Sequence, residues 1–379
     1  MGCRTKCLTI VIIVLGGIMK KKRKVFKIIL TVVIAFVAFI AACLIVFTAA
    51  EYRPADEESI EIKTASQTSL ETALPTDEEL TILSWNIGYC GLSDDADFFM
   101  DAGNGVYAKD EATVNNNLEN IESIIAKQDA DIILIQEIDL DSTRSYHVNQ
   151  IEDFTENAFT DYASTFAYNF KVLWMPFPIP PYGHIQSGIL TLTNVQPTEA
   201  TRIQLPCPFS WPYRILQLKR CLDVERIPVE NSDKELVLIN LHLEAYDEGE
   251  GKIEQTKMLV EIMQAEYEKG NYVIAGGDYN QSFSGTDTSM YPVESEEYLQ
   301  CGILDESVFS TNFSFYMDNT LPSCRSLDRA YDKTDENFQY YLIDGFIVSD
   351  NVEVKNMETM DYGFQYSDHN PVKMSVRLK

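Results

Sequence analysis

The feature that most constrains this chain is a run of 23 residues without a charged side chain, from Ile28 to Ala50. As an α-helix this run would be about 34 Å long, because a helix rises about 1.5 Å per residue. The hydrocarbon core of a bilayer is about 30 Å thick, so the run is long enough to span it. A helix buried on one side of a soluble core would show a polar face, and this run has none. We therefore expect one transmembrane anchor over 28–50.

The residues on either side of this run predict its orientation. Lys20–Lys24 and Lys27 lie directly before it, and no cluster of positive charge follows it. Basic residues next to a membrane span stay in the cytoplasm. The sequence therefore predicts a basic cytoplasmic segment over 1–27 and places everything after Ala50 outside the cytoplasm.

Two alternatives concern the N-terminal segment. Met19 begins a basic stretch typical of an export signal, so 1–18 would be a start-site artefact if translation begins there. The residues Ile40–Cys43 resemble a bacterial lipoprotein cleavage site, but the apolar run continues beyond them, which favours an uncleaved anchor. Both readings leave the remainder of the chain on the outer side of the membrane.

Positive charge gathers before Glu51, and the rest of the chain is strongly acidic. The chain has 30 Lys and Arg against 58 Asp and Glu, a net charge of −28. Eight of the basic residues and none of the acidic ones lie in 1–50, so 51–379 carries 22 basic against 58 acidic residues, a net charge of −36. Such a surface repels polyanions, which disfavours bulk nucleic-acid binding. A local site for a phosphate group remains compatible with it.

Five cysteines follow the membrane run: Cys90, Cys207, Cys221, Cys301 and Cys324. An exported location permits disulfides, but an odd number leaves at least one cysteine unpaired within the chain. Cys207 and Cys221 flank 13 residues, and a disulfide between them would close this segment into a stapled hairpin. The sequence does not settle the pairing, and the spacings are not typical of a metal site.

The pattern of apolar residues divides the exported part into a linker and one domain. Residues 51–79 are rich in Glu, Asp, Ser and Thr and predict a solvated acidic linker. Apolar residues recur every three or four positions in 110–128 and 253–269, which predicts two helices. Short β-type runs are expected as strands over 80–86, 131–137, 187–193, 235–242, 271–277, 341–348 and 372–378. Strands mixed with few helices predict an α/β sandwich of two sheets with helices outside, over 80–379.

These strands end on polar residues where a purely structural strand would close on Gly, Pro or Ser. The residues concerned are Asn86, Gln136, Glu137, His242, Asp278, Asn280, Asp344, Asp368 and His369. A carboxylate within an aliphatic run, such as Asp344, is costly unless it is paired or bound to a metal. Each motif alone has an ordinary explanation, such as a turn at Asp278 or a satisfied core histidine at His242. Their order along the chain is more informative than any one of them.

That order resembles the endonuclease/exonuclease/phosphatase superfamily, whose fold is called DNase I-like. The resemblance rests on a W-N block at 85–86, a Q-E block at 136–137, a G-D-x-N block at 277–280 and an S-D-H-N-P-V block at 367–372. It covers roughly 80–379. It implies a four-layer α/β sandwich, with two packed mixed β-sheets flanked by helices and the site at one edge of the sheets.

The resemblance implies a metal centre. Glu137 is similar to the family's main Mg²⁺ ligand, Asn86 lies beside it, and Asp368 is a second carboxylate near the metal. Mg²⁺ prefers one or two carboxylates plus waters, and a hard cation neutralises charge that develops on phosphoryl oxygens. We expect Mg²⁺ as the cofactor, with Mn²⁺ as the alternative. The resemblance leaves open whether one or two ions bind.

The resemblance also implies a catalytic group. Asp278 looks like the residue that orients and deprotonates the attacking water, and Asn280 like a donor to a phosphoryl oxygen. Asp344 and His369 resemble the family's Asp–His pair, in which a buried carboxylate would keep the imidazole protonated. His242 matches a histidine of the DNase I and sphingomyelinase branches, which favours these branches.

Several basic residues near the motifs are candidates for binding substrate. Arg144 follows Glu137 closely and Arg325 precedes the Asp344 strand, so each is either a phosphate contact or an ordinary surface arginine. The loops that carry them resemble those of bacterial membrane-anchored members of the superfamily. Lys219 and Arg220 are open to the same two readings, and the stretch from Asp97 to Asp101 looks like a shaped loop after Asn86.

Together these features predict a membrane-anchored, extracytoplasmic, metal-dependent phosphoric ester hydrolase acting on small or lipid phosphoesters. An extracellular endonuclease or exonuclease is the first alternative, and the acidic surface disfavours it for long nucleic acids. A catalytically silent binding module on the same fold is the second. A binding module has no need for the full set of motifs, which speaks against it. The oligomeric state stays open.

Overall fold

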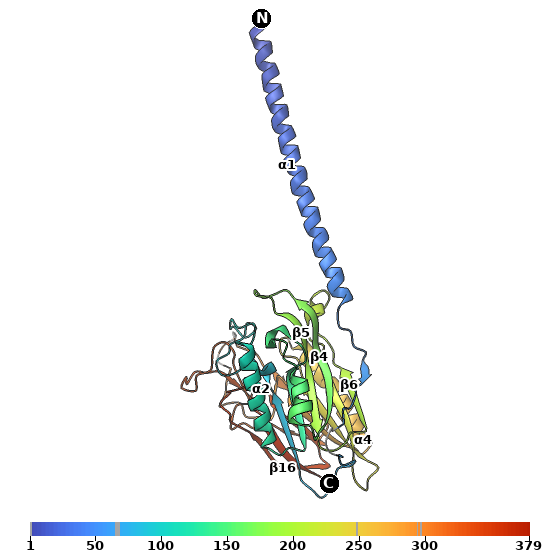
Figure 1. Ribbon diagram of the computed structural model, residues 1–379. Coiled ribbons are helices and arrows are strands. Elements are labelled where there is room, and N and C mark those ends of the chain that lie inside the picture. The colour runs from blue at the N-terminus through green and yellow to red at the C-terminus, as the bar shows by residue number, and fades with distance from the viewer. Residues whose placement is uncertain (1, 65–68, 248, 294, 296–297) are drawn as a thin grey trace. The chain divides into compact units, whose positions relative to one another are not determined.

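The computed structural model of the chain describes residues 2–64, 69–247, 249–293, 295 and 298–379, and within these ranges it describes side chains from Met19 onward (Figure 1). The chain divides into two compact units, one ending at Glu51 and the other running from Tyr52 to Lys379. The second unit carries all the motifs described above.

The first unit is one helix, α1, over Gly2–Ala49. The basic residues and the uncharged run expected as separate segments are therefore parts of the same helix. Its portion Met19–Ala49 is long and apolar enough to cross a membrane, a property that signal sequences share. Length and composition support a membrane span but do not fix which side each end occupies.

The described part of 51–79, expected as a solvated linker, is mostly exposed but is attached to the sheets at several points. Strand β1, Glu57–Ser59, pairs antiparallel with strand β6, Glu199–Gln204. Leu74 is 1% exposed within the apolar core and forms a bridge with Val229. The polar composition gives no sign of this attachment, because the segment is held through its backbone and a few side chains, Leu74 and Ile60 among them.

Two large β-sheets form the centre of the second unit. The six-stranded sheet has the order β16-β17-β2-β3-β5-β4, and the seven-stranded sheet the order β1-β6-β7-β8-β9-β15-β12. The strands of the first are β2 Leu80–Asn86, β3 Ile132–Asp139, β4 Ala163–Met175, β5 Gly183–Thr193, β16 Val352–Thr359 and β17 Val372–Leu378. The remaining strands of the second are β7 Cys221–Pro228, β8 Glu235–His242, β9 Tyr272–Asp278, β12 Phe313–Tyr316 and β15 Asp344–Ser349.

Helices cover the outer faces of both sheets (Figure 1). Helix α2, Glu111–Ala126, packs on the six-stranded sheet through Val114, Leu118 and Ile121. Helix α4, Glu250–Glu268, packs on the seven-stranded sheet through Leu259 and Met263. The short elements are η1 Gly88–Cys90, η2 Thr143–Ser145, α3 Gln150–Glu152, the π-helical η3 Asp153–Ala158, η4 Tyr213–Leu216, η5 Glu306–Val308, β10 Ser282–Phe283, β11 Ile303–Leu304, β13 Cys324–Arg325 and β14 Tyr340–Tyr341.

The inner faces of the two sheets form one apolar core. Ile82 and Leu134 from the six-stranded sheet meet Leu238, Ile274 and Phe346 from the seven-stranded sheet, and all are fully buried. Burying side chains of this size stabilises the fold by about 1.5–3 kcal/mol each. The expected four-layer sandwich of helix, sheet, sheet and helix is therefore confirmed.

The five cysteines of this unit are all free thiols, so the disulfide considered between Cys207 and Cys221 does not form. Cys221 is buried in β7, where its sulfur donates to the Tyr168 carbonyl at 3.6 Å. Cys207 lies 3.9 Å from a different carbonyl, that of Leu218. The two thiols are thus occupied by separate partners.

Polar groups share the interface between the sheets with the apolar core. Thr165 on β4 has one hydroxyl proton, yet its oxygen lies 2.7 Å from Asp223 Oδ2 and 2.6 Å from Glu225 Oε1. Both carboxyls are buried. Burial, together with the charge of Asp223, raises the pKa of Glu225 to about 8. One of the two carboxyls therefore keeps its proton at neutral pH and donates a hydrogen bond to the Thr165 hydroxyl. The hydroxyl in turn donates to the other carboxyl.

We expect the pH dependence of stability to change in the Glu225→Gln variant. A folded pKa above the unfolded value contributes stability that is complete below the ordinary value of 4.5 and is lost as pH rises through about 8. The glutamine of the variant cannot ionise, so the wild-type protein should lose stability relative to the variant across this window, by at most about 1.4 kcal/mol per pH unit.

Urea unfolding at a series of pH values measures this difference. Glu230→Gln, at an exposed carboxylate, controls for the chemical change itself. A pH-independent difference between wild type and Glu225→Gln would show that Glu225 is ionised throughout.

Candidate active site

The predicted site residues meet because of how the strands are ordered. Strands β2 and β3 are parallel neighbours that align Asn86 with Gln136, and β8 and β9 are parallel neighbours that align His242 with Asp278. The carboxyl ends of parallel strands lie at one edge of a sheet. Strand β15 runs antiparallel to β9 and begins with Asp344 directly opposite Asp278. Both sheets therefore deliver polar residues to the same edge.

Two of these residues sit in strained backbone. Glu137 and Asn280 have φ values of 53° and 51°, in the left-handed region that non-glycine residues rarely adopt. Glu137 lies where the register between β3 and β5 shifts, between Ile135 and Ile138. Such a bulge re-aims a side chain, and strain of this kind concentrates at functional sites.

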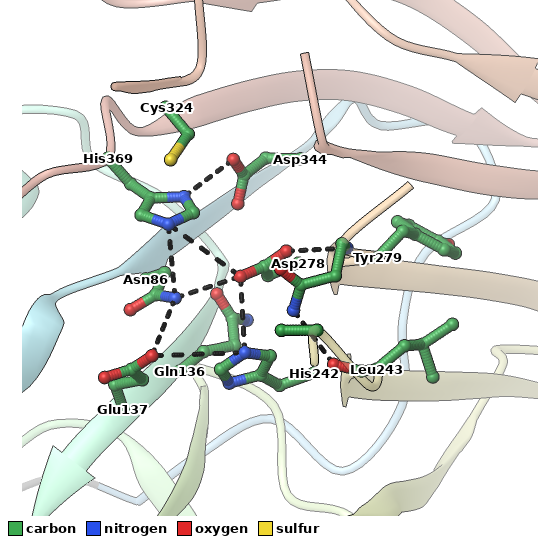
Figure 2. A network of polar contacts seen from close by, with 12 residues as sticks. Asn86, Gln136, Glu137, His242, Leu243, Asp278, Tyr279, Cys324, Asp344 and His369 are labelled. Carbon is green, nitrogen blue, oxygen red and sulfur yellow. Dashed lines mark hydrogen bonds and ion pairs between the residues drawn. The ribbon is translucent and has the colours of Figure 1, made fainter. Parts of the chain in front are cut away.

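The Asn86 side chain is the hub of the polar network (Figure 2). Its Nδ2 donates to Asp278 Oδ2 at 3.0 Å and lies 3.5 Å from both Glu137 Oε1 and His369 Nε2. Its Oδ1 accepts the Gly88 N–H at 3.1 Å, which fixes the orientation of the amide. Asn86 thereby holds residues from four strands or loops at one point.

Asp344 and His369 form the buried pair that the sequence predicts. His369 Nδ1 lies 2.8 Å from Asp344 Oδ2, and the two side chains are 5% and 2% exposed. Burial lowers the pKa of His369, but the charge of Asp344 outweighs it and holds that pKa well above its ordinary value. His369 is therefore an imidazolium at neutral pH, with Nε2 facing Asp278 at 3.8 Å.

Asp278 lies between His242 and His369, whose pKa values are shifted in opposite directions. Burial and the neighbouring Asp344 raise the pKa of Asp278 to about 7. His242 Nε2 lies 3.3 Å from Asp278 Oδ2, and burial followed by the charge of Arg220 lowers the pKa of His242 well below its ordinary value. Asp278 Oδ1 accepts the Asn280 N–H at 2.8 Å. A carboxyl that titrates near neutral pH suits proton transfer.

The segment that carries Asp368 is tied to the end of β2. Trp85 Nε1 donates to the His369 carbonyl at 2.8 Å, and Ser367 Oγ donates to the Asn86 carbonyl at 2.8 Å. A Cβ on Gly88, whose φ is 50°, would come within 2.7 Å of Asp368 Oδ1, so only glycine allows this approach. The Asp368 carboxylate therefore sits in a fixed place.

Asp101 is a site residue that the motifs do not identify. Burial raises its pKa to about 7, Tyr246 donates to its Oδ1 at 3.1 Å, and the charges of Asp368 and Glu137 raise the pKa further. Its only sequence signal is its place in the glycine-rich loop after β2. Three carboxyls thus converge on the cavity, and their repulsion is the kind that a bound cation offsets. Oxygen ligands of this type suit Mg²⁺.

The structure gives Arg144 contacts behind Glu137. Its Nε and Nη2 donate to the two Asp139 carboxylate oxygens at 3.1 and 2.9 Å, and Nη1 donates to Tyr182 at 2.9 Å. The guanidinium also lies 3.9 Å from the ring centre of Tyr89. Nη1 is 3.9 Å from Glu137 Oε2, so Arg144 is placed to orient that carboxylate. It lies outside the walls of the active-site cavity.

Arg325 lines the cavity with its Nη atoms bound to backbone and its Nε buried without a hydrogen-bond partner among the described residues. It is 1% exposed, and its Nη1 and Nη2 donate to the carbonyls of Ser326 and Ser93 at 2.9 and 2.7 Å. Its own backbone N–H donates to the Asp368 carbonyl at 3.0 Å. These bonds favour a role in joining the loops around Asp368. A contact of Arg325 or Arg144 with substrate stays a prediction.

Arg220 also lines the cavity, and its side chain makes fewer hydrogen bonds than that of Arg325. It is 3% exposed, its Nη1 donates to the His242 carbonyl at 3.4 Å, and its Nε is buried without a hydrogen-bond partner among the described residues. Its ion pair with Glu244 is loose, with Nε 3.9 Å from Oε2. The Lys219-Arg220 pair in the sequence was open to two readings, and this geometry favours a contact with an anion.

The cavity at the sheet edge holds about 580 Å³. Nearly all of the predicted residues line it, and Asp344 lies behind His369. Those in its walls are Asn86, Glu137, His242, Asp278, Asn280, Arg325, Asp368 and His369. The arrangement combines a base of suitable pKa, a protonated imidazole and converging carboxylates, which together suit hydrolysis of an anionic ester.

Comparisons with known proteins agree with this geometry. A family model described as "Endonuclease/Exonuclease/phosphatase family" matches residues 83–369. The fold is similar to that of an endonuclease/exonuclease/phosphatase from Beutenbergia cavernae, with a TM-score of 0.54 and 15% identity over 79% of this chain and 72% of that one. No curated protein sequence matches the chain.

Two further solved structures share the fold. One is an endonuclease/exonuclease/phosphatase from Bacteroides vulgatus, with a TM-score of 0.50 and 14% identity over 80% of this chain and 100% of that one. The other is the catalytic domain of human nocturnin with a bound sulfate anion, with a TM-score of 0.50 and 13% identity over 84% and 97%. At such low identity these similarities establish the fold alone.

We expect the two buried histidines to titrate in opposite directions. NMR of the imidazoles in the full-length protein, which has 4 histidines, should show His369 protonated at neutral pH and His242 neutral in mildly acidic solution. Asp344→Asn should lower the pKa of His369, because it removes the charge that stabilises the imidazolium. An unchanged titration of His369 in this variant would contradict the pairing.

Proposed function

Because the chain belongs to the endonuclease/exonuclease/phosphatase family, we propose that it is a Mg²⁺-dependent phosphoester hydrolase that acts on small or lipid phosphoesters. The observation that carries the proposal is the position of Asp278. Its carboxylate, with a pKa of about 7, lies between a neutral and a protonated histidine in a cavity that also presents Glu137 and Asp368.

Glu137 and Asp368, with Asn86 beside them, are the residues that would hold the metal ion. When bound there, Mg²⁺ neutralises charge that develops on the phosphoryl oxygens. The family is generally dependent on divalent metals, and the mutual repulsion of the acidic groups supports a cation at this place. The all-oxygen ligands suit Mg²⁺, with Mn²⁺ as the alternative that the same ligands would accept.

Asp278 acts as the base in this proposal. Its Oδ1 is held by the Asn280 N–H, so its Oδ2 is directed at the centre of the cavity. A water bound there would lose a proton to Asp278 as its oxygen bonds to phosphorus, while the P–O bond to the leaving group breaks and that group takes a proton from solvent. Asn280 Nδ2 donates to the Leu243 carbonyl at 2.9 Å, which leaves its second N–H for a phosphoryl oxygen.

The two histidines supply donors for the transition state. His369 is held protonated by Asp344, so its Nε2–H can donate to the oxyanion without a proton being taken up first. His242 is neutral and donates through the nitrogen that faces Asp278. Fixed donors aimed at developing charge are worth several kcal/mol in a buried site.

We propose further that helix α1 anchors the enzyme in the membrane and that the catalytic unit lies outside the cytoplasm. The apolar portion Met19–Ala49 and the basic residues at its start support this orientation. The acidic surface disfavours long nucleic acids, so an extracellular nuclease is an outcome that the assay below distinguishes.

We expect the full-length protein in detergent to hydrolyse a generic phosphodiester, bis(p-nitrophenyl) phosphate, in a reaction that EDTA abolishes and Mg²⁺ restores. Asp278→Ala should lower kcat by at least about a hundredfold, since general base catalysis contributes roughly 10²- to 10⁴-fold. DNA and inositol phosphates are tested in parallel. No EDTA-sensitive turnover on any substrate would contradict the enzyme and favour a silent binding module.

We also expect Glu137→Gln to weaken Mg²⁺ binding measured by titration calorimetry. The loss should exceed the roughly tenfold to hundredfold effect of removing an outer hydrogen-bonding partner, because a ligand oxygen loses its charge. Glu254→Gln, on the exposed face of α4, is the matched control. Equal Mg²⁺ affinity in the Glu137→Gln and Glu254→Gln variants would show that Glu137 is not a ligand of the metal.

A further inference from the structure

A second cavity opens beside the active site. It holds about 950 Å³ and shares Phe98, Glu137, Arg220, His242 and Tyr246 with the first. Its remaining walls are largely apolar and come mainly from the loop after β2, from β4 and the turn that follows it, and from η4 and the segment after it. They include Phe99, Phe170, Met175, Phe177 and Leu218. A ligand that spans both cavities would have its polar end at the catalytic residues and an apolar end here.

The outer rim of this cavity exposes large apolar side chains. In the turn between β4 and β5, Ile179 is 93% exposed and Phe177 51%. Trp174 precedes them at 44%, and Trp211 and Tyr213, near η4, are 53% and 56% exposed. Exposed apolar groups gathered in this way mark an interaction surface. Trp and Tyr are the residues that favour the boundary between water and lipid.

The backbone of the rim is suited to an apolar environment as well. Prolines occupy positions 176, 178, 180 and 181 in the turn between β4 and β5. Proline has no backbone N–H, so each one removes a donor that would go unsatisfied in lipid. A rim that met only soluble ligands would gain nothing from such exposed apolar side chains.

The wall between the two cavities supplies a contact for an anion. Arg220 lines both and is 3% exposed, and its buried Nε has no hydrogen-bond partner among the described residues, only the loose ion pair with Glu244 at 3.9 Å. A phosphate placed between Arg220 and the catalytic residues would direct one ester substituent along Phe98 and Leu218. The order along this path is catalytic carboxylate, arginine, apolar groove and exposed rim.

We propose that this groove receives the apolar chain of a membrane phospholipid and that the rim, residues 173–181 with 211–213, inserts into the membrane surface. The inference rests on the proposed phosphoester hydrolase and names its substrate class. The net charge of −36 over 51–379 repels anionic lipid, so a zwitterionic headgroup fits the surface better.

Tryptophan fluorescence tests the insertion directly. The chain has 3 tryptophans, of which Trp85 is 2% exposed in the core and the other two, Trp174 and Trp211, lie in the rim. The full-length protein is reconstituted into phosphatidylcholine vesicles with and without bromine on the acyl chains. Brominated lipid should quench a large part of the emission, and the Trp174→Phe/Trp211→Phe variant, which reports Trp85 alone, should lose this quenching. Equal emission in the two kinds of vesicle would overturn the insertion.

Chain-length dependence tests the groove. We expect kcat/KM to be higher for long-chain phosphatidylcholine than for its monomeric short-chain form. Phe177→Ser should lower the long-chain value about tenfold, the effect of losing one aromatic contact with the lipid chain. Bis(p-nitrophenyl) phosphate should be hydrolysed equally by both proteins. Val308→Ser, at a 48% exposed position in η5 outside both cavities, is the control.

The outcomes separate the two proposals. Turnover of bis(p-nitrophenyl) phosphate without any effect of chain length or of Phe177→Ser would overturn the lipid groove and leave the hydrolase intact. Absence of turnover on every phosphoester would overturn the hydrolase and the assignment of the groove to a substrate with it. Preferential cleavage of DNA would likewise overturn the lipid assignment.

Discussion

The active site depends on how the two sheets are locked face to face. Gln136 Nε2 on β3 donates to Asn240 Oδ1 on β8 at 2.8 Å, and Asn240 Nδ2 donates to the Leu190 carbonyl on β5 at 3.0 Å. Both side chains are completely buried, where a polar group without a partner would be costly. A slip of either sheet would break these bonds, so they fix the register. Glu137 directly follows Gln136 on one sheet, and His242 comes two residues after Asn240 on the other. The fixed register therefore brings Glu137 Oε1 to 4.0 Å from His242 Nε2.

The same locked edge concentrates negative charge that must be balanced. Asp278 and Asp344 are directly opposite on neighbouring strands, an arrangement that is unfavourable for two ionised groups. The balance comes from His369, which reaches both carboxylates from the loop before β17, and from the Asn86 amide. Electrostatics and backbone geometry are thus coupled, because Trp85 near the end of β2 donates to the His369 carbonyl and the Gly88 N–H fixes the Asn86 amide.

The sequence predicted the parts of this arrangement that repeat a simple physical pattern. Strands β2 and β8 have the predicted bounds, 80–86 and 235–242, because runs rich in aliphatic residues end there on a polar residue. Strands β4, β7 and β16 were missed because polar side chains interrupt them and pair across the sheets, as Thr165 and Glu225 do. Asp101 was not assigned to the site and Arg220 was left open between two readings, since loop residues carry no periodicity and only the folded chain brings them to the cavity. The pairing of β1 with β6, in the segment after α1, was not predicted because backbone pairing leaves no trace in composition.

The free thiols have a consequence for where this domain can exist. Cys90, Cys221, Cys301 and Cys324 are buried, and burial raises the pKa of each thiol, so little reactive thiolate forms. Cohesion comes from the sheet interface rather than from covalent cross-links. The stability of the catalytic unit therefore does not depend on disulfide bonds. The unit needs no oxidative folding machinery, and a reducing environment does not lower its stability.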